Sequence, residues 1–441
     1  MTVEPRTPYP GLRERRQREL QRVLDETQPP HSAHEGAPAQ VHARIADRVD
    51  ALRGDLTALA TDLHEHPELA YAEHHAAAAI ASVLERHGVR TEVGAYGLPT
   101  AIRAVCHNDG PGNNGPTVAV IAEYDGLPGI GHACGHNIIA ASAVGAFLAL
   151  AEEFGTVELI GTPAEEGGGG KQRILDADGF EHVDFALMAH PGNLDVAGSR
   201  SLGFRQVAVT YRGIAAHSAT GPHLGVNALD AVVAAYTGIA QLRQHILPSD
   251  KVHGIITDGG QAPNIVPETA SAVFYVRSLE LDTLAELHTR VDTILRAAAD
   301  ATGTAADVSW DNAPPYLPLR TNNTLEARYA VALSGRRSVL PTAARPVEEV
   351  ASTDMGNVSL AVPAIHPIIA IAPRGVANHT AEFAKYAADA QPAILDAAVG
   401  LAGTAADFLH DEQLRSDARA EFDRLGGPVS LRDALAKEQT A

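Results

Sequence analysis

The sequence predicts an α/β fold, in which a mixed, mainly parallel sheet is flanked by helices and a smaller α+β unit is inserted. Two observations indicate this architecture. Short apolar, β-branched segments alternate with helical segments over residues 100–190, which is typical of βαβ units. Around residue 203 the order changes to strand, helix, strand, strand, helix, which indicates a separate α+β unit.

Composition limits the classes of protein to which the chain can belong. Its 441 residues are 45% hydrophobic and 20% charged, as expected of a globular protein. A formal charge of −20 disfavours nucleic acid or anionic lipid as the main partner. No apolar run reaches the about 18 residues of a membrane span, and the N-terminus has no signal-peptide core. We therefore expect a cytoplasmic protein. With only two cysteines, Cys106 and Cys134, a disulfide framework is not expected.

The elements of the larger unit follow in order along the chain. Residues 1–40 are charged and contain the segment QPPHSAHEGAPAQ, and we expect a flexible N-terminal arm there. Residues 41–202 form the first part of the larger domain. Apolar residues at helical spacing predict helices within 41–69, 76–89 and 138–155. Strands are expected at TAIRAVC, TVAVIAEYD, TVELIGTP and FALMAH.

The inserted unit is expected over residues 203–312. Strands are predicted at FRQVAVTYRG, VHGIITDGG and TASAVFYVRS, and helices over residues 227–246 and 281–302. The segment ADVSWDNAPPYLP, with its two prolines, is interpreted as the return linker. Residues 313–441 then complete the larger domain with apolar strands and Ala-rich helices.

A first candidate for metal binding is the segment GHACGH, which lies between a predicted strand and a predicted helix. Cys134 and His136 are two residues apart, and His132 is two residues before the cysteine. Thiolate and imidazole ligands on a tight turn both suit zinc. Taken alone the motif is weak, because a buried cysteine and a hydrogen-bonded histidine at a helix start would give the same pattern.

A second candidate is GTPAEEGGGGK, where an apolar strand runs directly into Glu165 and Glu166. Adjacent carboxylates point in different directions at a strand end, so one can bind a metal while the other acts as general base. The alternative is a solvated acidic loop. His190 in FALMAHPG and His379 in GVANHTAEF also follow apolar runs. Each histidine alone could be a loop residue, but together these groups indicate a site that gathers an ion.

These motifs carry a resemblance to a known family. EYDGLPGIGHACGH, GTPAEEGGGGK, AHPG, AAHSA and the late STDMGNVSLAVPAIHP through ANHTAEF resemble the co-catalytic metallopeptidases that include glutamate carboxypeptidases, aminoacylases and aminobenzoyl-glutamate hydrolases. The resemblance is greatest to the amidohydrolase branch with a cysteine in place of the bridging aspartate. It covers residues from about Val41 to about Leu409 and implies a metallopeptidase domain with an inserted lid and dimerisation domain.

The resemblance also implies roles for residues of the larger domain. Two divalent ions, Zn or Mn, would be held by Cys134, His136, Glu166, His190 and His379. Glu165 would be the general base, and Asp125 would orient a ligand. Glu123 stands where many relatives have a ligand histidine, and Asn137 stands where the best-known amidohydrolases have aspartate. The second departure fits the aminobenzoyl-glutamate hydrolase and dipeptidase-like subgroup.

Three residues of the inserted unit take roles from the same resemblance. His217 matches a histidine that reaches across a dimer to the oxyanion, and Asn264 and Arg277 match residues that hold the substrate carboxylate. We therefore expect a homodimer formed through this unit, with each active centre borrowing His217 from its partner. The helix that follows carries one apolar stripe of Leu229, Val232, Val233 and Tyr236.

The expected activity is hydrolysis of an amide bond in a small carboxylate-bearing substrate: an N-acyl amino acid, an aminobenzoyl-glutamate-like amide or a dipeptide. One alternative is a metal-independent hydrolase with Cys134 as nucleophile. Another is a catalytically inactive metal-binding or regulatory protein on a peptidase scaffold, although an intact Glu165 argues against it. Small-molecule substrates, and neither nucleic acid nor membrane, are the expected partners.

Overall fold

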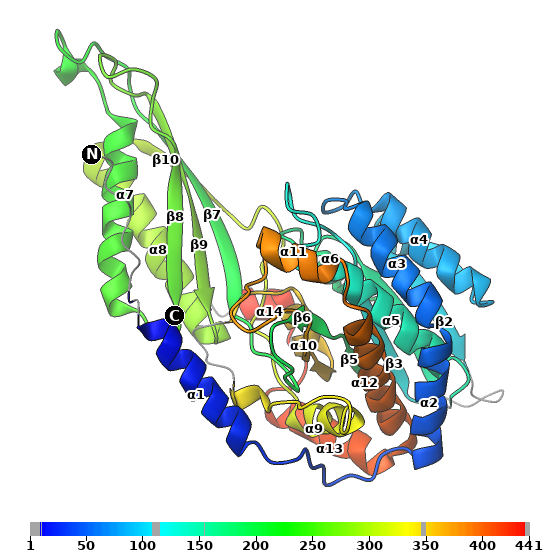
Figure 1. Cartoon of the computed structure of the whole chain (residues 1–441). Helices are drawn as coiled ribbons and strands as arrows, with labels where there is room; N and C mark the ends of the chain where they lie inside the picture. Colours follow the sequence, from blue (N-terminus) through cyan, green and yellow to red (C-terminus); the bar gives the residue numbers. More distant parts are fainter. Residues whose placement is uncertain (1–8, 10, 108–114, 154, 345–349, 437–441) are drawn as a thin grey trace.

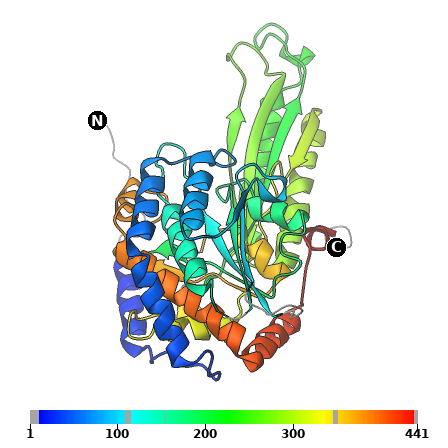
Figure 2. The ribbon, with the colours of Figure 1, turned by 90° about the vertical axis from the view of Figure 1, so that its right-hand side faces the viewer.

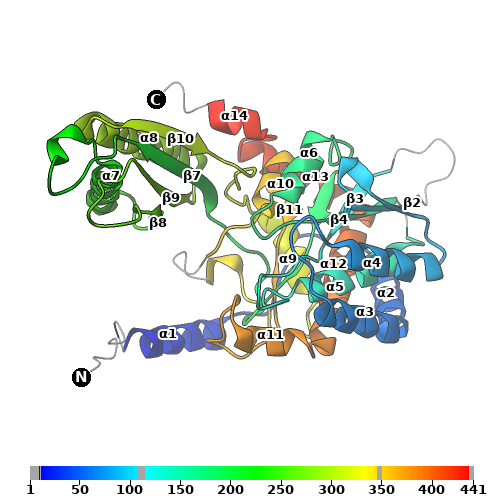
Figure 3. The same ribbon diagram turned by 90° about the horizontal axis from the view of Figure 1, so that it is seen from above.

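The computed structural model describes residues 9, 11–107, 115–153, 155–344 and 350–436. They form a rounded larger domain and an elongated inserted domain that projects from it (Figure 1); we call them the catalytic domain and the lid, after the roles that the resemblance implies. Seen from above, the lid lies to one side of the catalytic domain (Figure 3). The two domains have separate hydrophobic cores.

The catalytic domain is built on a six-stranded sheet with the order β1-β2-β4-β3-β5-β11. The strands are β1 (Thr91–Val93), β2 (Ile102–His107), β3 (Thr117–Glu123), β4 (Thr156–Thr162), β5 (Phe185–Leu187) and β11 (Ala364–Ile365). β3, β4, β5 and β11 are parallel, whereas β1 and β2 are antiparallel to their neighbours. This arrangement confirms the predicted mixed, mainly parallel sheet. A further pair, β6 (His190–Gly192) with β12 (Ile368–Ala370), lies beyond the carboxyl edge.

Helices cover both faces of this sheet. The first face packs against α2 (Ala39–Ala51), α3 (Arg53–Glu65), α4 (His74–Arg86), α5 (His136–Leu150) and α12 (Gln391–His410) (Figure 2). The second face packs against α6 (Gly170–Asp176) and α10 (Met355–Ala361). Successive β3 residues therefore serve different cores, since Val118 and Val120 face the first layer and Ala119 and Ile121 the second.

Two further helices, α9 (Asn323–Ala332) and α13 (Glu412–Arg424), also contribute buried residues to the first core. The other helices of this domain are α1 (Leu12–Glu26), α11 (Ala381–Ala387) and α14 (Leu431–Ala436). Among the described residues, only α12 is long and apolar enough to cross a membrane by length and composition. Its most apolar window is 89% buried inside the protein, as expected of a core helix.

The lid contains a four-stranded antiparallel sheet with the order β10-β7-β9-β8. Its elements are β7 (Gly203–Arg212), α7 (Ala228–Leu242), β8 (Lys251–Asp258), β9 (Thr269–Ser278), α8 (Leu281–Thr302) and β10 (Ala305–Trp310). Alternate β9 side chains are buried, because α7 and α8 cover one face of the sheet. β8 is an edge strand whose Ile255 is 65% exposed.

Three sequence expectations differ from the structure. The flexible arm expected over residues 1–40 is wrong for Leu12–Glu26, which forms α1 because Leu20, Val23 and Leu24 pack onto the catalytic domain. The return linker contains strand β10, which pairs with β7. The stripe on α7 is divided, since Val232 is buried in the lid core while Val233 is exposed.

Candidate active site

The candidate site lies at the carboxyl edge of the parallel strands, where ligands of open α/β sheets bind. Glu123 ends β3, and Asp125 follows two residues later. Glu165 and Glu166 follow β4, His190 begins β6 after β5, and Cys134 and His136 stand at the start of α5. His379 precedes α11. Five segments far apart in sequence thus meet at one edge.

The turn between Cys134 and His136 depends on a glycine. Gly135 has φ 86°, and a Cβ at this position would lie 2.8 Å from the Pro191 side chain. A side chain here would meet both backbone strain and a collision. The glycine therefore lets two ligand-type residues flank a tight turn beside His190 and Pro191.

Cys134 is common to two groups of ligand atoms. One group is formed by Cys134, His136 and His190, and the other by Cys134, Glu166 and His379. Cys134 Sγ lies 3.5 Å from His190 Nε2, and His379 Nε2 lies 3.2 Å from Glu166 Oε1. The structure thus brings together all five residues that the resemblance implied as ligands, with the thiol between the two groups.

The donor atoms fit divalent ions. His136 Nε2 is buried without a hydrogen-bond partner among the described residues, and buried Glu166 Oε1 has His379 Nε2 at 3.2 Å without the geometry of a hydrogen bond. Their unused lone pairs would be costly unless an ion satisfied them. Asp125 Oδ1 lies 2.8 Å from His136 Nδ1, and the Pro191 carbonyl lies 2.8 Å from His190 Nδ1. Protonation of each Nδ1 leaves Nε2 as a ligand, and the sulfur, nitrogen and carboxylate set suits Zn or Mn.

Glu165 and Glu166 both face His136, with which they form a third group of ligand-type atoms. Glu165 lies 3.9 Å from His136 Nε2, and it differs from Glu166 in that it also forms a cluster with Glu123 and Asp354. Burial, followed by the neighbouring Glu123 and Glu166 carboxylates, raises the pKa of Glu165. The hydroxyl of Tyr316 donates to the Glu165 carbonyl and accepts from the Gly167 N–H at 2.9 Å, which fixes the backbone of this loop.

Lys171 and Asp354 are functional-site residues that the sequence interpretation missed. Lys171 Nζ donates to Glu123 Oε1 and, at 2.6 Å, to Asp354 Oδ1, and all three side chains are 0% exposed. Burial alone would lower the pKa of Lys171, but the two carboxylates raise it, so the ammonium stays charged. The one available signal was its position at the end of the glycine run, as one of only four lysines in the chain.

Glu123 is positioned by this ammonium group. Its second oxygen, Oε2, is buried without a hydrogen bond and lies 3.5 Å from His136 Nε2. One oxygen of Glu123 is therefore held by Lys171, while the other faces the ligand group. Asn137 is structural in this chain, since its side-chain amide donates to the carbonyls of Ala60 and Ala387. His132 is buried and belongs to none of the ligand groups found among the described residues.

The structure separates the three lid residues. His217 lies in the connection between β7 and α7, and Asn264 in the connection between β8 and β9. These connections are at the lid tip, far from the catalytic domain (Figure 1), and the Ser218 N–H donates to the Asn264 carbonyl at 3.1 Å. Arg277 lies at the opposite end of the lid sheet and donates to Ser352 Oγ at 2.6 Å. Ser352 lines the cavity that contains the ligand residues. Within one chain, only Arg277 lies near the site.

The lid matches a known domain family. The model described as the peptidase dimerisation domain of the M20 type matches residues 201–302. The mouse protein named Xaa-Arg dipeptidase is 37% identical over 397 residues, which cover 86% of this chain and 91% of that protein. The chain therefore belongs to the M20 family of metallopeptidases, which confirms the resemblance found in the sequence.

Other relatives and solved structures agree with this assignment. A p-aminobenzoyl-glutamate hydrolase subunit of Escherichia coli is 34% identical, with 67% of this chain and 65% of that protein covered. A dinuclear metal-binding M20 peptidase from Bacillus subtilis has a TM-score of 0.60 at 20% identity, with 79% of this chain and 98% of that chain covered. An aminobenzoyl-glutamate utilization protein from Klebsiella pneumoniae has a TM-score of 0.61. At these identities the structural likeness concerns the fold.

Proposed function

We propose that the protein is a metal-dependent hydrolase of an amide bond in a small carboxylate-bearing substrate. N-acyl amino acids, aminobenzoyl-glutamate-like amides and dipeptides fit this description. The observation that carries the proposal is the buried Glu165 beside a ligand set that shares Cys134. A site built only to bind metal would not need a carboxylate outside the Cys134 groups, whereas a hydrolase needs a general base there.

Each residue of the site has a part in the proposed reaction. Two divalent ions, Zn or Mn, would be held by Cys134, His136, Glu166, His190 and His379; when bound they lower the pKa of the attacking water and polarise the scissile carbonyl. Glu165 accepts the proton of that water and later donates it to the leaving amine.

Arg277 is proposed to hold the substrate carboxylate. Its guanidinium packs 4.8 Å from the Phe204 ring centre and donates to Ser352 Oγ, which restricts its orientation. A planar guanidinium held in this way can form two parallel hydrogen bonds with a carboxylate. Asn264 cannot share this task within one chain, because the connection between β8 and β9 that carries it is at the lid tip (Figure 1). We propose that it arrives with His217 from a second chain.

His217 is proposed to bind the oxyanion across a homodimer. Its Nδ1 accepts the N–H groups of Ala219 and Thr220 at 3.1 and 3.2 Å, so the ring proton belongs on Nε2. A neutral histidine with an exposed Nε2–H is a suitable donor to a developing oxyanion. Apolar side chains around the tip and edge strand that are 41–71% exposed support a covered surface: Ile214, Leu224, Ile255, Ile256 and Ile265.

Subunit mixing tests the shared site. His217→Ala and Glu165→Gln should each be nearly inactive, because each removes a group that every centre requires. In a random mixture, half of the dimers contain one intact centre, so activity should recover to about a quarter of wild type. Mixtures that are shown to contain heterodimers yet stay as inactive as the parents would exclude the borrowed histidine.

The cysteine-nucleophile alternative is weaker on physical grounds. Cys134 Sγ does face His190 Nε2, but burial raises the pKa of the thiol, which disfavours the thiolate that a nucleophile needs. That alternative also assigns no role to Glu165 and Glu166. The inactive-scaffold alternative leaves the buried Glu165 without a function.

Chelation separates the three possibilities. Dipeptides, N-acyl amino acids and aminobenzoyl-glutamate should be assayed before chelation, after it, and after Zn²⁺, Mn²⁺ or Co²⁺ is returned. We expect turnover to be lost in chelator and regained with metal. Turnover that survives complete metal removal would favour a cysteine nucleophile, and no turnover with any substrate would favour an inactive scaffold. We also propose a cytoplasmic location, which the charge of −20 and the expected metabolite-like substrates support.

A further inference from the structure

The N-terminal helix α1 forms part of the wall of the active-site cavity. This cavity of about 1190 Å³ contains the ligand residues Cys134, Glu166, His190 and His379. The same cavity is lined by Tyr9, which precedes α1, by Gln17 and Glu19, and by α1 residues spaced three or four apart: Leu12, Arg16, Leu20 and Val23. One face of α1 therefore borders the space in which a substrate would lie.

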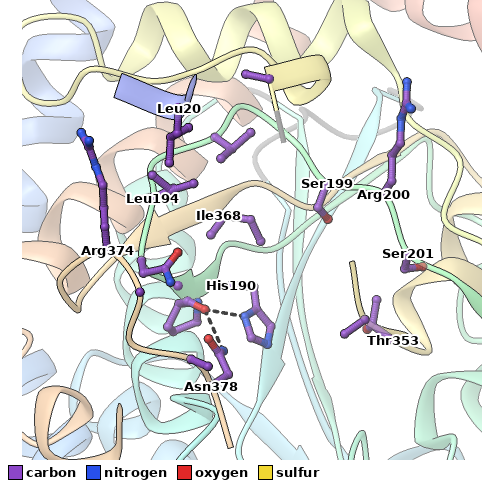
Figure 4. A pocket seen from close by; sticks show the side chains of 18 of the residues that line it. Leu20, His190, Leu194, Ser199, Arg200, Ser201, Thr353, Ile368, Arg374 and Asn378 are labelled. Atoms are coloured by element: carbon purple, nitrogen blue, oxygen red, sulfur yellow. Dashed lines mark hydrogen bonds between the residues drawn. The ribbon is translucent and has the colours of Figure 1, made fainter. Parts of the chain in front are cut away.

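The position of α1 is set by contacts close to the metal-ligand residues. Leu20 and Val23 pack in a small apolar cluster with Ile368, and Ile368 is the β12 residue that pairs with His190. Figure 4 shows Leu20, Leu194 and Ile368 together along one side of the cavity, above His190. α1 is thus only one layer of side chains away from a ligand of the proposed metal centre.

A charged contact links α1 to the loop that carries another ligand. Arg374 Nη1 donates to Gln21 Oε1 of α1 at 2.9 Å. Arg374 lies five residues before His379, and it also lines the cavity. The contact joins α1 to the loop before α11, so both elements form one continuous wall.

The charges on the cavity wall are unusual for this chain. Outside the candidate metal ligands and Glu165, the charged residues that line the cavity are Arg16, Arg200, Arg374 and Glu19, and the histidine is His366. Arg374 and Arg200 stand on opposite sides of the cavity (Figure 4). Three arginines against one glutamate form a cationic surface on a protein of net charge −20. Such a surface attracts an anionic group and repels a cationic one.

From this arrangement we propose that α1 and the Arg374 loop form a subsite for a second anionic group of the substrate. Arg374 is its main cation, Arg16 flanks it, and the Leu20 side of the wall contacts the apolar part of the substrate. The preferred amide then carries an acidic group in addition to the carboxylate assigned to Arg277. A substrate with a basic side chain is disfavoured. This preference differs from the one that the name of the mouse relative, Xaa-Arg dipeptidase, indicates for that protein. The inference rests on the proposed function.

Matched substrates and variants test the subsite. The first series varies the charge on the leaving amino acid and consists of Ala-Glu, Ala-Gln and Ala-Arg. The second series varies the charge on the acyl group and consists of N-succinyl-alanine and N-butanoyl-alanine. In at least one series we expect kcat/KM to favour the acidic member about tenfold or more, the usual worth of a charge-assisted hydrogen bond. Arg374→Gln should abolish this preference and Arg16→Gln should reduce it.

Arg18→Gln is the control variant. Arg18 is on the same helix but does not line the cavity, and it pairs only weakly with Glu14 at 4.0 Å. It should keep the wild-type ratio between acidic and neutral substrates. Equal kcat/KM for acidic and neutral members in both series, or equal ratios in Arg374→Gln and Arg18→Gln, would overturn the subsite while leaving amide hydrolysis intact.

A binding measurement keeps the subsite testable if the proposed function fails. Calorimetric titration of the full chain with glutarate and butyrate, with and without Zn²⁺, compares a dicarboxylate with a monocarboxylate that cannot be hydrolysed. We expect glutarate to bind about tenfold more tightly, and this advantage to disappear in Arg374→Gln but not in Arg18→Gln. Equal binding of both acids would reject the subsite even if no amide is turned over.

Discussion

Substitution of Lys171 by methionine should strongly destabilise the catalytic domain. Lys171, Glu123 and Asp354 are all 0% exposed, and the ammonium pairs with both carboxylates. Lys171→Met keeps much of the side-chain volume but leaves two buried carboxylates without their partner. Removal of one partner from a buried ion pair usually costs about 3–5 kcal/mol. We expect a loss in that range, with a midpoint temperature lower by roughly 5 °C or more.

The measurement should be made in chelator, so that no divalent ion replaces the lost positive charge. Far-UV circular dichroism follows the helices of both domains, while the single tryptophan, Trp310, lies in β10 and reports the lid alone. Lys385→Met is a matched control, because Lys385 is exposed on α11. It should change stability by no more than about 0.5 kcal/mol.

A rescue experiment distinguishes the loss of charge from the loss of packing. Glu123→Gln and Asp354→Asn, added to Lys171→Met, remove the two uncompensated carboxylates and should recover part of the stability. If Lys171→Met is as stable as Lys385→Met, the buried ion pair does not stabilise the fold. If the triple variant is no better than Lys171→Met alone, the defect is one of packing and the electrostatic argument is refuted.

Three further predictions concern Cys134, Gly135 and Glu326. In a Cys106→Ser background, Cys134 should resist alkylation in the metal-loaded protein and react after chelation, because a bound metal occupies the thiolate. Equal labelling in both states would exclude Cys134 as a metal ligand. Gly135→Ala should weaken metal binding at least about tenfold. Gly129→Ala is the control and should leave metal affinity unchanged, since Gly129 has φ 74° and an added Cβ would meet nothing within 4 Å. Equal metal affinities of the two variants would refute the steric argument. Burial raises the pKa of Glu326 to about 7 from 4.5, so the folded chain binds this proton more tightly than the unfolded chain. The free energy of unfolding therefore falls as pH rises between these two values. Relative to wild type, Glu326→Gln should therefore gain up to about 3 kcal/mol between pH 4 and pH 8, measured by urea unfolding, and a pH-independent difference would contradict this assignment.

Much of the fold could be predicted because local patterns and tertiary structure agree. Strand β9 and helix α8 match the predicted segments 269–278 and 281–302, since alternating or helical spacing of apolar residues decides both. Helix α1 could not be predicted in this way. Its mean composition is strongly polar, and it is ordered mainly by the contacts of Leu20, Val23 and Leu24 with distant segments of the chain.

Part of the candidate site could be predicted from the sequence, and part of it could not. Cys134, His136, Glu166, His190 and His379 come together at one sheet edge, because each follows a strand or begins a helix there. The ion pair between Lys171 and Asp354 joins residues 183 positions apart, and no local sequence pattern predicts it. The separation of Asn264 from Arg277 depends on the length of the lid strands, which places one residue at each end of the lid.

The most direct test of the proposed chemistry measures metal content and turnover together in Glu165→Gln. Glu166→Gln is the natural comparison, since it alters the adjacent carboxylate that faces His379 at 3.2 Å. For Glu165→Gln we expect two divalent ions per chain, as in wild type, with turnover reduced at least about a hundredfold, as for loss of a general base. Glu166→Gln should instead lose metal. Near-normal turnover in Glu165→Gln would contradict the assignment of Glu165 as the general base. A loss of metal from Glu165→Gln like that from Glu166→Gln would contradict it as well.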